Sequence, residues 1–162
     1  MWQPLRKGVA DLYRRAQISQ AANERYLDAL AAATTSTRLG ELLRQTCRPV
    51  IFNGRRARGL RPWSPDEVAL FQALSRGEFC VNGLRNRDLQ PRLFTTPSTC
   101  PKEKRRRSAR VSYLLRLLRA HGILRKVPKS HRYQVSPRGR ELLTAVLTAH
   151  RSSVEELTRM AA

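Results

Sequence analysis

The chain has 162 residues, of which 41% are hydrophobic, so it can build one sizeable core or two small ones and is not a disordered basic tail. Its formal net charge is +20, from 32 Lys and Arg against 12 Asp and Glu, which predicts a polyanionic partner with nucleic acid as the leading candidate. No apolar run approaches the roughly 20 residues that span a bilayer, and the N-terminus lacks the apolar core of a signal peptide, so we expect no membrane partner.

The cysteines indicate a reducing environment. Cys47, Cys80 and Cys100 are odd in number, widely spaced and form no C-x-x-C pair. Such a set does not make a disulfide framework. We therefore expect a cytoplasmic protein, or one associated with the nucleoid.

Residues 5–33 are expected to form one long helix, with an interruption near residues 18–22 as the alternative. The segment has no internal proline, and its apolar residues recur at helical spacing. These residues are Leu5, Val9, Leu12, Ala16, Tyr26, Leu27 and Leu30. Their side of the helix needs a partner, either the rest of the chain or a second copy. A helix that begins almost at the first residue also suggests a downstream piece of a longer ancestral protein.

A short helix and a basic hairpin are predicted next. The short helix is capped at Ser36 or Thr37 and stopped by Pro49. In residues 50–58, Asn53-Gly54 is the strongest two-residue hairpin signal, because both central residues must take positive φ. The hairpin and its exit carry Arg55, Arg56, Arg58 and Arg61. The first three are predicted to contact phosphates; the alternative is a solvated edge strand protected by charge.

The signals for a helix are most complete just after residue 63. Ser64 is a cap, Pro65 takes the first helical position, Glu67 completes a capping box and Gly77 closes the helix. The apolar face is supplied by Val68, Leu70, Phe71 and Leu74. We interpret this helix as the first element of a second domain.

Residues 78–81 are then expected to form a short strand, and residues 82–94 a second helix. Asn82 is the expected cap of that helix, and Pro91 shortens or kinks it. Arg85 and Arg87 are placed on it to touch a nucleic-acid backbone. Residues 95–103 are an irregular connection to the next helix.

The helix that follows, at residues 102–121, is the predicted recognition element. Val111, Leu114, Leu115 and Leu118 form an apolar stripe, and Gly122 can take the left-handed conformation that ends a helix. The rest of the surface is basic or polar, and its candidate contact residues are Lys104, Arg105, Arg106, Arg107, Arg110, Ser112, Tyr113 and Arg116. Arginine can pair bidentately with guanine, whereas the run at residues 105–107 is better suited to phosphates.

A second hairpin with a basic tip is predicted at residues 123–135. Both of its strands alternate, and Pro128 with polar neighbours supplies the turn. The candidate contact residues here are Lys126, Lys129, Ser130, His131 and Arg132, although His131 fits a polar turn equally well. Residues 102–132 hold 12 basic residues and one acidic residue, so most of the excess charge is in these two elements.

A long final helix is expected from Pro137 to about Met160. Ser136 and Pro137 provide its cap and first position. Its apolar residues are Leu142, Leu143, Val146, Leu147, Val154 and Leu157. The last two continue beyond what a small domain has to cover, which raises the alternative of dimerisation through the terminal helices.

The order helix, strand, tip, strand, helix at residues 108–139 resembles the second half of a winged helix-turn-helix domain, the fold of bacterial regulators of the MarR and PadR types. The resemblance implies a mainly α fold with a winged-helix domain at residues 63–147. An N-terminal helical segment with a basic hairpin at 1–62 would precede it, and the end of the C-terminal helix at 148–162 would follow.

A broader resemblance covers most of the chain. Residues 8–30, 77–89 and 114–147 together look like the C-terminal part of a family of longer, uncharacterised bacterial proteins. This likeness implies the winged-helix tail of a larger ancestor, one spread by mobile elements. It brings no activity with it.

The residues give no support for an enzyme, a cofactor or a metal site. His121, His131 and His150 lie far apart and pair with no cysteine at zinc spacing. The acidic residues do not pair in a way that predicts two-metal cleavage, and there is no P-loop or dinucleotide fingerprint. Tyr133 is better explained as an inward residue of a strand than as a nucleophile.

We therefore expect a non-catalytic protein that binds nucleic acid, most of all duplex DNA, as a regulator or as the DNA-recognition subunit of a mobile-element or defence system. Two alternatives remain open. One is an RNA-binding subunit of a ribonucleoprotein, since arginine-rich helices also suit folded RNA. The other is a non-catalytic accessory subunit of a nuclease or recombinase.

Overall fold

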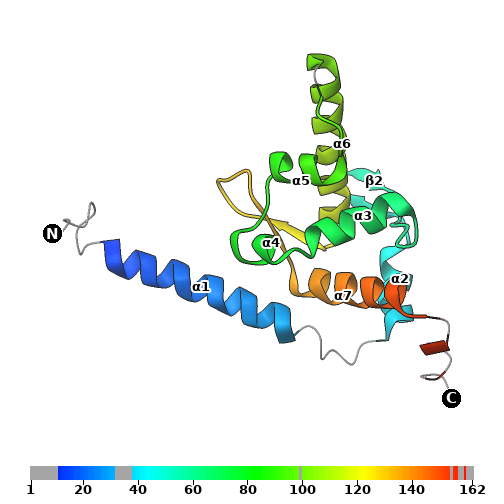
Figure 1. Ribbon diagram of the computed structural model, residues 1–162, viewed down its shortest axis with the longest axis horizontal. Coiled ribbons are helices and arrows are strands. Elements are labelled where there is room, and N and C mark those ends of the chain that lie inside the picture. The colour runs from blue at the N-terminus through cyan, green and yellow to red at the C-terminus, as the bar shows by residue number, and fades with distance from the viewer. Residues whose placement is uncertain (1–10, 32–37, 99, 154, 157–158, 160–162) are drawn as a thin grey trace.

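The computed structural model describes residues 11–31, 38–98, 100–153, 155–156 and 159. Over these residues the chain is mainly helical, with seven helices and two small antiparallel hairpins (Figure 1). In chain order the elements are α1 (Leu12–Ala31), α2 (Leu39–Thr46), β1 (Val50–Phe52), β2 (Arg55–Ala57), α3 (Pro65–Leu74), α4 (Gly77–Asn82), α5 (Asn86–Leu93), α6 (Pro101–Ala120), β3 (Leu124–Lys126), β4 (Tyr133–Val135) and α7 (Pro137–Arg151).

A single core is built mainly from helices α3, α5, α6 and α7. Each of these helices contributes a side chain with 0% of its surface exposed, namely Phe71, Leu89, Leu118 and Val146. The apolar stripe predicted for α6 is confirmed, since its four residues are all buried, together with Leu117. Burial of these aliphatic and aromatic side chains is the main force that fixes α6 on the body.

The β3–β4 hairpin is joined by one further backbone bridge. Leu84 and Tyr133 exchange two N–H···O bonds of 2.8 Å each. The strand predicted at residues 78–81 is wrong, because these residues belong to helix α4. Gly83 then takes φ +65° and brings the chain against the Tyr133 carbonyl, so that the bridge forms at Leu84 instead.

The N-terminal hairpin is confirmed where Asn53-Gly54 predicted it. Asn53 and Gly54 have φ of 51° and 71°, and β1 pairs with β2 in antiparallel register. Helix α2 before it is preceded by Arg38, while the predicted caps Ser36 and Thr37 lie outside the described residues.

The capping box predicted for α3 is wrong. Ser64 has the backbone conformation of an N-cap, but its side chain makes no cap hydrogen bond. Glu67 instead accepts a hydrogen bond of 2.7 Å from the backbone N–H of Arg61 and lies 2.6 Å from the Arg58 guanidinium. The Arg58 guanidinium and the Arg61 N–H, both from outside the helix, therefore take the place of the Ser64 N–H that a capping box would pair with Glu67. Gly77 does not close α3, which ends at Leu74; it begins α4.

Helix α5 starts later than predicted. Asn82 ends α4, and the N-cap position of α5 is Arg85, whose backbone N–H donates to the Asp88 carboxylate at 2.8 Å. Asp88 therefore provides the cap that was assigned to Asn82. Pro91 lies inside this short helix, which ends at Leu93.

The final helix is shorter than predicted. Ser136 does cap α7, because its hydroxyl accepts from the Gly139 N–H at 2.9 Å, but α7 ends at Arg151. Ser153 and Glu156 exchange two hydrogen bonds of 3.0 and 3.1 Å in the pattern of a capping box, which starts a new turn. Val154 and Leu157, expected on the long helix, lie outside the described residues.

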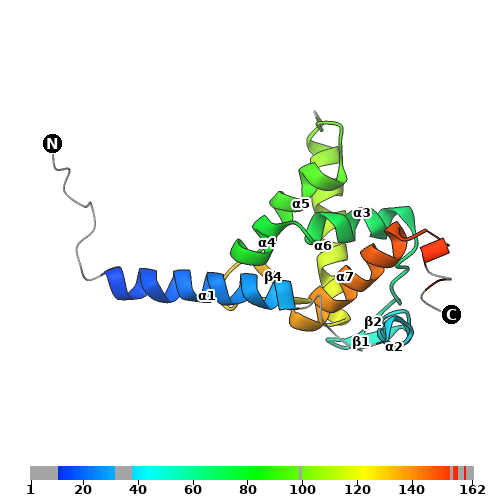
Figure 2. The ribbon, with the colours of Figure 1, turned by 60° about the horizontal axis from the view of Figure 1, so that its bottom comes forward.

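Helix α1 runs without interruption and extends away from the body, which it meets at α4 and α7 (Figures 1 and 2). The predicted positions 5–10 and 32–33 lie outside the described residues. Leu12, Tyr26 and Leu27 remain 58%, 52% and 62% exposed. None of the helices that the structure describes is both long and apolar enough to cross a membrane.

Candidate nucleic-acid interface

Helix α6 presents a basic face on the side opposite its buried stripe. Arg105, Ala109, Ser112 and Arg116 are exposed and follow one another at three- and four-residue spacing. Tyr113 is 38% exposed, and the Arg116 guanidinium lies 5.7 Å from the centre of its ring. The predicted division of this helix into a core side and a free side therefore holds.

The basic run at the start of α6 does not act as one unit. Lys104, Arg105 and Arg106 are exposed, but the side chain of Arg107 is only 12% exposed. Arg107 pairs with Glu103, donates to the Thr96 carbonyl and lies 5.0 Å from the ring centre of Phe94. Its guanidinium thus holds the connection after α5 against α6. Of the four residues predicted here to contact nucleic acid, Lys104, Arg105 and Arg106 are the ones that remain exposed.

Polar side chains lock α5 against α6. The Asn86 amide donates to the Ser108 carbonyl at 2.9 Å and to the Ser112 hydroxyl at 2.8 Å. Gln90 donates in turn to the Asn86 side-chain oxygen at 2.6 Å. Ser112, predicted as a contact residue, is therefore also part of the joint that fixes the angle between the two helices.

The two arginines of α5 differ in their freedom. Arg87 is 75% exposed and lies 3.7 Å from the Asp88 carboxylate. Arg85 is half-buried at the cap position, with its Nε atom out of contact with solvent. Of this predicted pair, Arg87 is the one that faces solvent.

At the β3–β4 tip, two of the predicted residues shape the turn and three are exposed. The Ser130 hydroxyl donates to the Val127 carbonyl at 2.9 Å, and Arg132 donates to the Asn82 carbonyl at 2.8 Å, which ties the tip to α4. Lys126, Lys129 and His131 are exposed. Lys129 takes a positive φ of 53° at the turn.

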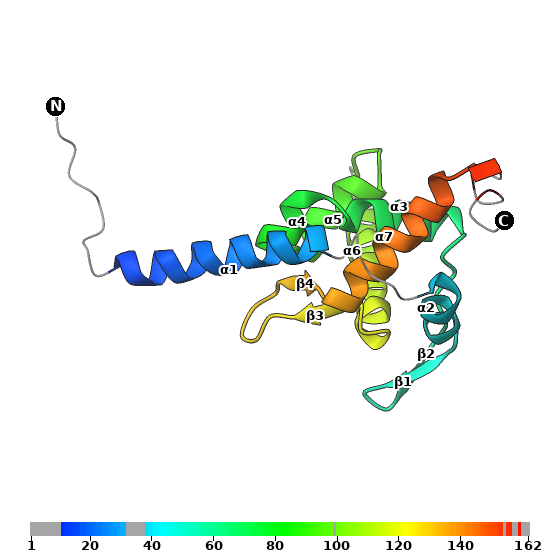
Figure 3. The ribbon, with the colours of Figure 1, turned by 90° about the horizontal axis from the view of Figure 1, so that it is seen from below.

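The β1–β2 hairpin lies on the other side of α6. In Figure 3 both hairpins project toward the bottom of the view with the end of α6 between them, and Figure 1 also places α6 between them. The predicted residues Arg55 and Arg56 are exposed. Phe52 is held by Arg119 of α6, whose guanidinium lies 5.3 Å from the ring centre. This contact between Phe52 and Arg119 was not predicted from the sequence. The signal for it was the aromatic residue directly before Asn53-Gly54.

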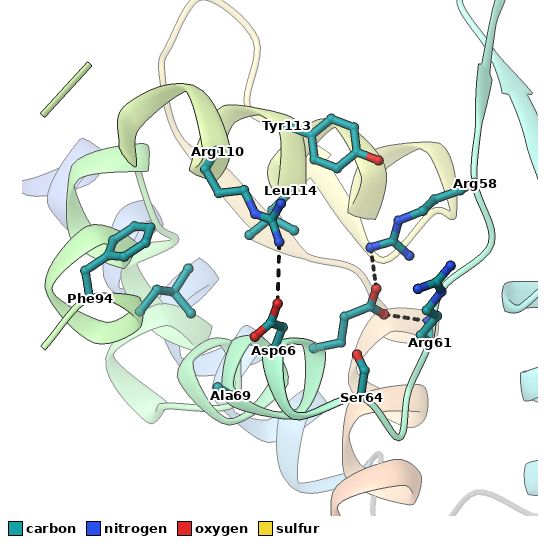
Figure 4. Close-up of a pocket in the computed structure, with 11 residues that line it drawn as sticks. Arg58, Arg61, Ser64, Asp66, Ala69, Phe94, Arg110, Tyr113 and Leu114 are labelled. Carbon is teal, nitrogen blue, oxygen red and sulfur yellow. Dashed lines mark hydrogen bonds and ion pairs between the residues drawn. The ribbon is translucent and has the colours of Figure 1, made fainter. Parts of the chain in front are cut away.

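Beside this face, a half-open pocket of about 500 Å³ lies between α3, α6 and residues 58–64 (Figure 4). Its polar groups pair mostly with one another. Arg110 of α6 lies 3.5 Å from the Asp66 carboxylate, and Arg58 pairs with Glu67. The predicted contacts Arg58, Arg110 and Tyr113 thus come together here. Arg61, which the sequence placed on the exit of the hairpin as part of the same phosphate-contacting feature, also lines the pocket.

The pair of Arg58 and Glu67 is the most buried ionic contact of this region. Glu67 is 2% exposed, whereas the Arg58 side chain is 35% exposed. Burial lowers the pKa of Arg58, but the hydrogen bond and the charge of Glu67 outweigh it, so the pKa is raised above its usual value. Arg58 therefore stabilises the fold, and only the exposed part of its side chain faces solvent.

Two of the histidines, His121 and His150, make contacts within the fold. His121 is buried, with Nε2 2.8 Å from the Arg58 carbonyl oxygen, and His150 stacks on Trp63 at 6.5 Å between ring centres. Within the described part of the chain, no three His, Cys, Asp or Glu residues are grouped to hold a metal ion.

No protein-family model matches this chain, and neither the curated proteins nor the solved structures compared with it give a match. Its function is therefore derived from the chemistry of its own residues.

Proposed function

We propose that the chain binds nucleic acid, with duplex DNA as the first choice, through α6 and the β3–β4 hairpin of a winged helix-turn-helix domain. The order α3, α4, the isolated bridge at Leu84, α5, α6, β3 and β4 is compatible with this fold. In such domains the second helix of the pair enters the major groove and the hairpin reaches the backbone or an adjacent groove. The MarR- and PadR-like character of the wing remains part of this proposal.

The observation that carries the proposal is the charge of α6 and the β3–β4 hairpin together. Residues 102–132 hold 12 basic residues and one acidic residue, and that acidic residue, Glu103, is occupied by Arg107. A surface with so few counter-charges attracts phosphates and releases their counterions on binding. A face that served only for solubility would mix both signs.

The basic residues divide into those that would position the protein by contacting phosphates and those that would recognise bases. Lys104, Arg106, Lys126 and Lys129 suit phosphates, because they are long cations at the two ends of the surface. Arg105 and Arg116 lie on the free side of α6, where a guanidinium can pair with guanine in the major groove. No catalytic step is assigned. The role is that of a regulator, or of the DNA-recognition subunit of a mobile-element or defence system, in the cytoplasm or on the nucleoid.

Gel-shift competition among duplex DNA, single-stranded DNA and structured RNA at matched salt tests the proposal. Duplex DNA is expected to compete best. A preference for structured RNA favours the ribonucleoprotein alternative, for which exposed arginines are equally suited. Absence of binding to all three leaves the accessory-subunit alternative, in which the hairpin contacts protein.

We also propose that the exposed side of α1 contacts a second copy or a larger protein. Leu12, Tyr26 and Leu27 are more than half exposed on a helix that leaves the body. Size-exclusion chromatography with light scattering at tens of micromolar tests the homodimer, and a monomer there removes it.

A further inference from the structure

The β1–β2 hairpin exposes an apolar residue in the middle of a basic surface. Ile51 is 82% exposed, the highest value among the large hydrophobic residues of the described chain. Its cross-strand partner is Arg56, so both side chains lie on the same face of the hairpin. The neighbouring residue Phe52 lies on the opposite face, because side chains alternate along a strand. That face packs toward Arg119 of α6.

The hairpin is fixed to the body at its base as well as its side. The backbone of Gly59 approaches Cys47 so closely that an added Cβ would lie 1.8 Å from the Cys47 carbonyl oxygen. Leu60 donates from its N–H to the Thr46 carbonyl at 3.0 Å. Arg58, which follows β2, is held by Glu67 of α3 at 2.6 Å. These contacts hold the hairpin at a defined place beside α6.

Its position matches that of a second wing. Figures 1 and 3 agree that α6 lies between the two hairpins, and Figure 3 shows both hairpins projecting toward the same side of the molecule. A duplex whose major groove receives α6 therefore meets one hairpin on each flank. The β3–β4 tip offers Lys126 and Lys129, while β1–β2 offers Arg55, Arg56 and Ile51.

We infer that the β1–β2 hairpin enters the minor groove of duplex DNA and inserts Ile51 between two base pairs, with Arg56 beside it on the backbone. The inference rests on the proposed duplex binding. Isoleucine is one of the side chains that act as wedges in the minor groove, where they unstack a base step and kink the duplex by about 20–90°. Pyrimidine–purine steps, which unstack most easily, are the preferred sites.

The charge around Ile51 favours this occupant over a protein. Arg55 and Arg56 are exposed in the same hairpin, and Arg48 is exposed just before it. The cores of protein interfaces are depleted of charged residues, whereas a minor groove presents apolar sugar walls between two rows of phosphates. An exposed isoleucine surrounded by arginines therefore suits a minor groove better than a protein interface.

The test measures DNA bending separately from binding. A duplex of about 30 base pairs with a central TA step carries a fluorophore at each end, and energy transfer reports the bend. The parent protein is expected to raise the transfer. Ile51→Ser is expected to abolish the rise while affinity falls by less than about tenfold, because phosphate contacts supply most of the binding. Ile51→Leu, which keeps an apolar wedge, is expected to bend DNA as the parent does.

Ile18→Ser is the matched control, because Ile18 is also exposed, at 59%, and belongs to α1 and to neither hairpin. It should change neither signal. If the parent binds duplex DNA without a rise in energy transfer, the inference is wrong but the proposed function stands. An Ile51→Ser protein that bends DNA as the parent does has the same consequence. If the parent does not bind duplex DNA at all, the proposed function fails and this inference fails with it.

Discussion

The carboxylate of Glu67 lies 2.6 Å from the guanidinium of Arg58, and this contact joins the first turn of α3 to the segment that leaves the β1–β2 hairpin. Glu67 also accepts the N–H of Arg61 at 2.7 Å. One buried carboxylate therefore fixes the hairpin relative to the core. The placement of the basic surface thus depends on an acidic residue beneath it.

Glu67→Ala is expected to lower the free energy of unfolding by about 2–3 kcal/mol. It leaves the partly buried Arg58 without its counter-charge and the Arg61 N–H without its acceptor. Glu67→Gln keeps an acceptor for the N–H and is expected to cost less. Urea denaturation followed by circular dichroism measures both. Equal losses for the two variants would mean that the charge, and not the acceptor, carries the effect.

The pH dependence of this contact follows from the raised pKa of Arg58. A pKa that is higher in the folded state gives stability that is fully present below the unfolded pKa and is lost as pH rises through the folded one. Since the usual pKa of arginine is already far above the neutral range, this contribution is constant from neutral to moderately alkaline pH. A loss of the Arg58 contribution below pH 9, measured as the difference between parent and Arg58→Ala, would contradict this assignment.

Lys104 and Arg106, the two residues of α6 that suit phosphates, are expected to carry part of the salt dependence of DNA binding. Replacing both by Ala should weaken binding and reduce the slope of log affinity against log salt by about 2, since each phosphate contact contributes about 0.9. The control is Arg76→Ala with Arg151→Ala, which removes the same charge from exposed positions outside α6 and both hairpins. Fluorescence anisotropy over a salt series measures the slopes. Equal reductions in both proteins would show that only net charge matters.

Asp66 is expected to weaken DNA binding, because it is the acidic group that faces Arg110 at 3.5 Å beside the α6 surface. Asp66→Asn should raise affinity about threefold, as Arg110 gains freedom and a repulsive charge is removed. Asp66 is 84% exposed, so the fold should tolerate the change. Glu155→Gln is the control, since Glu155 has the same exposure and also pairs with an arginine. An equal gain there would make the effect one of net charge.

The parts of the fold that depend on neighbours in sequence were predictable. The stripe of Val111, Leu114, Leu115 and Leu118 follows from helical periodicity alone, and Asn53-Gly54 specifies its turn by its own backbone preferences. The exposed basic residues of α6 follow from the same periodicity. Local sequence patterns were therefore sufficient to predict both the β1–β2 hairpin and the exposed side of α6.

Features decided by distant partners were not predictable. Residues 78–81 hold three apolar residues after Glu78, a run too short to distinguish a strand from a helix, and the choice is settled by the contacts of Gly83 and Leu84 with Tyr133. Arg107 looks like its neighbours in sequence but turns inward to Glu103 and Thr96. Glu67 has the spacing of a capping box, yet Arg58 and Arg61 from the preceding segment take its oxygens.

Gly83 is expected to be indispensable for attaching the β3–β4 hairpin, whereas Gly40 is not. Gly83 has φ +65°, and a Cβ there would lie 2.6 Å from the Tyr133 carbonyl oxygen, so Gly83→Ala must both strain the backbone and push the bridge apart. We expect a loss of about 2 kcal/mol or more in the free energy of unfolding. Gly40→Ala, in helix α2 with nothing within 4 Å of the added atom, should instead stabilise by about 0.5–1 kcal/mol. Urea denaturation compares the two variants. A Gly83→Ala protein as stable as the parent would show that the Leu84–Tyr133 bridge does not hold the hairpin in place.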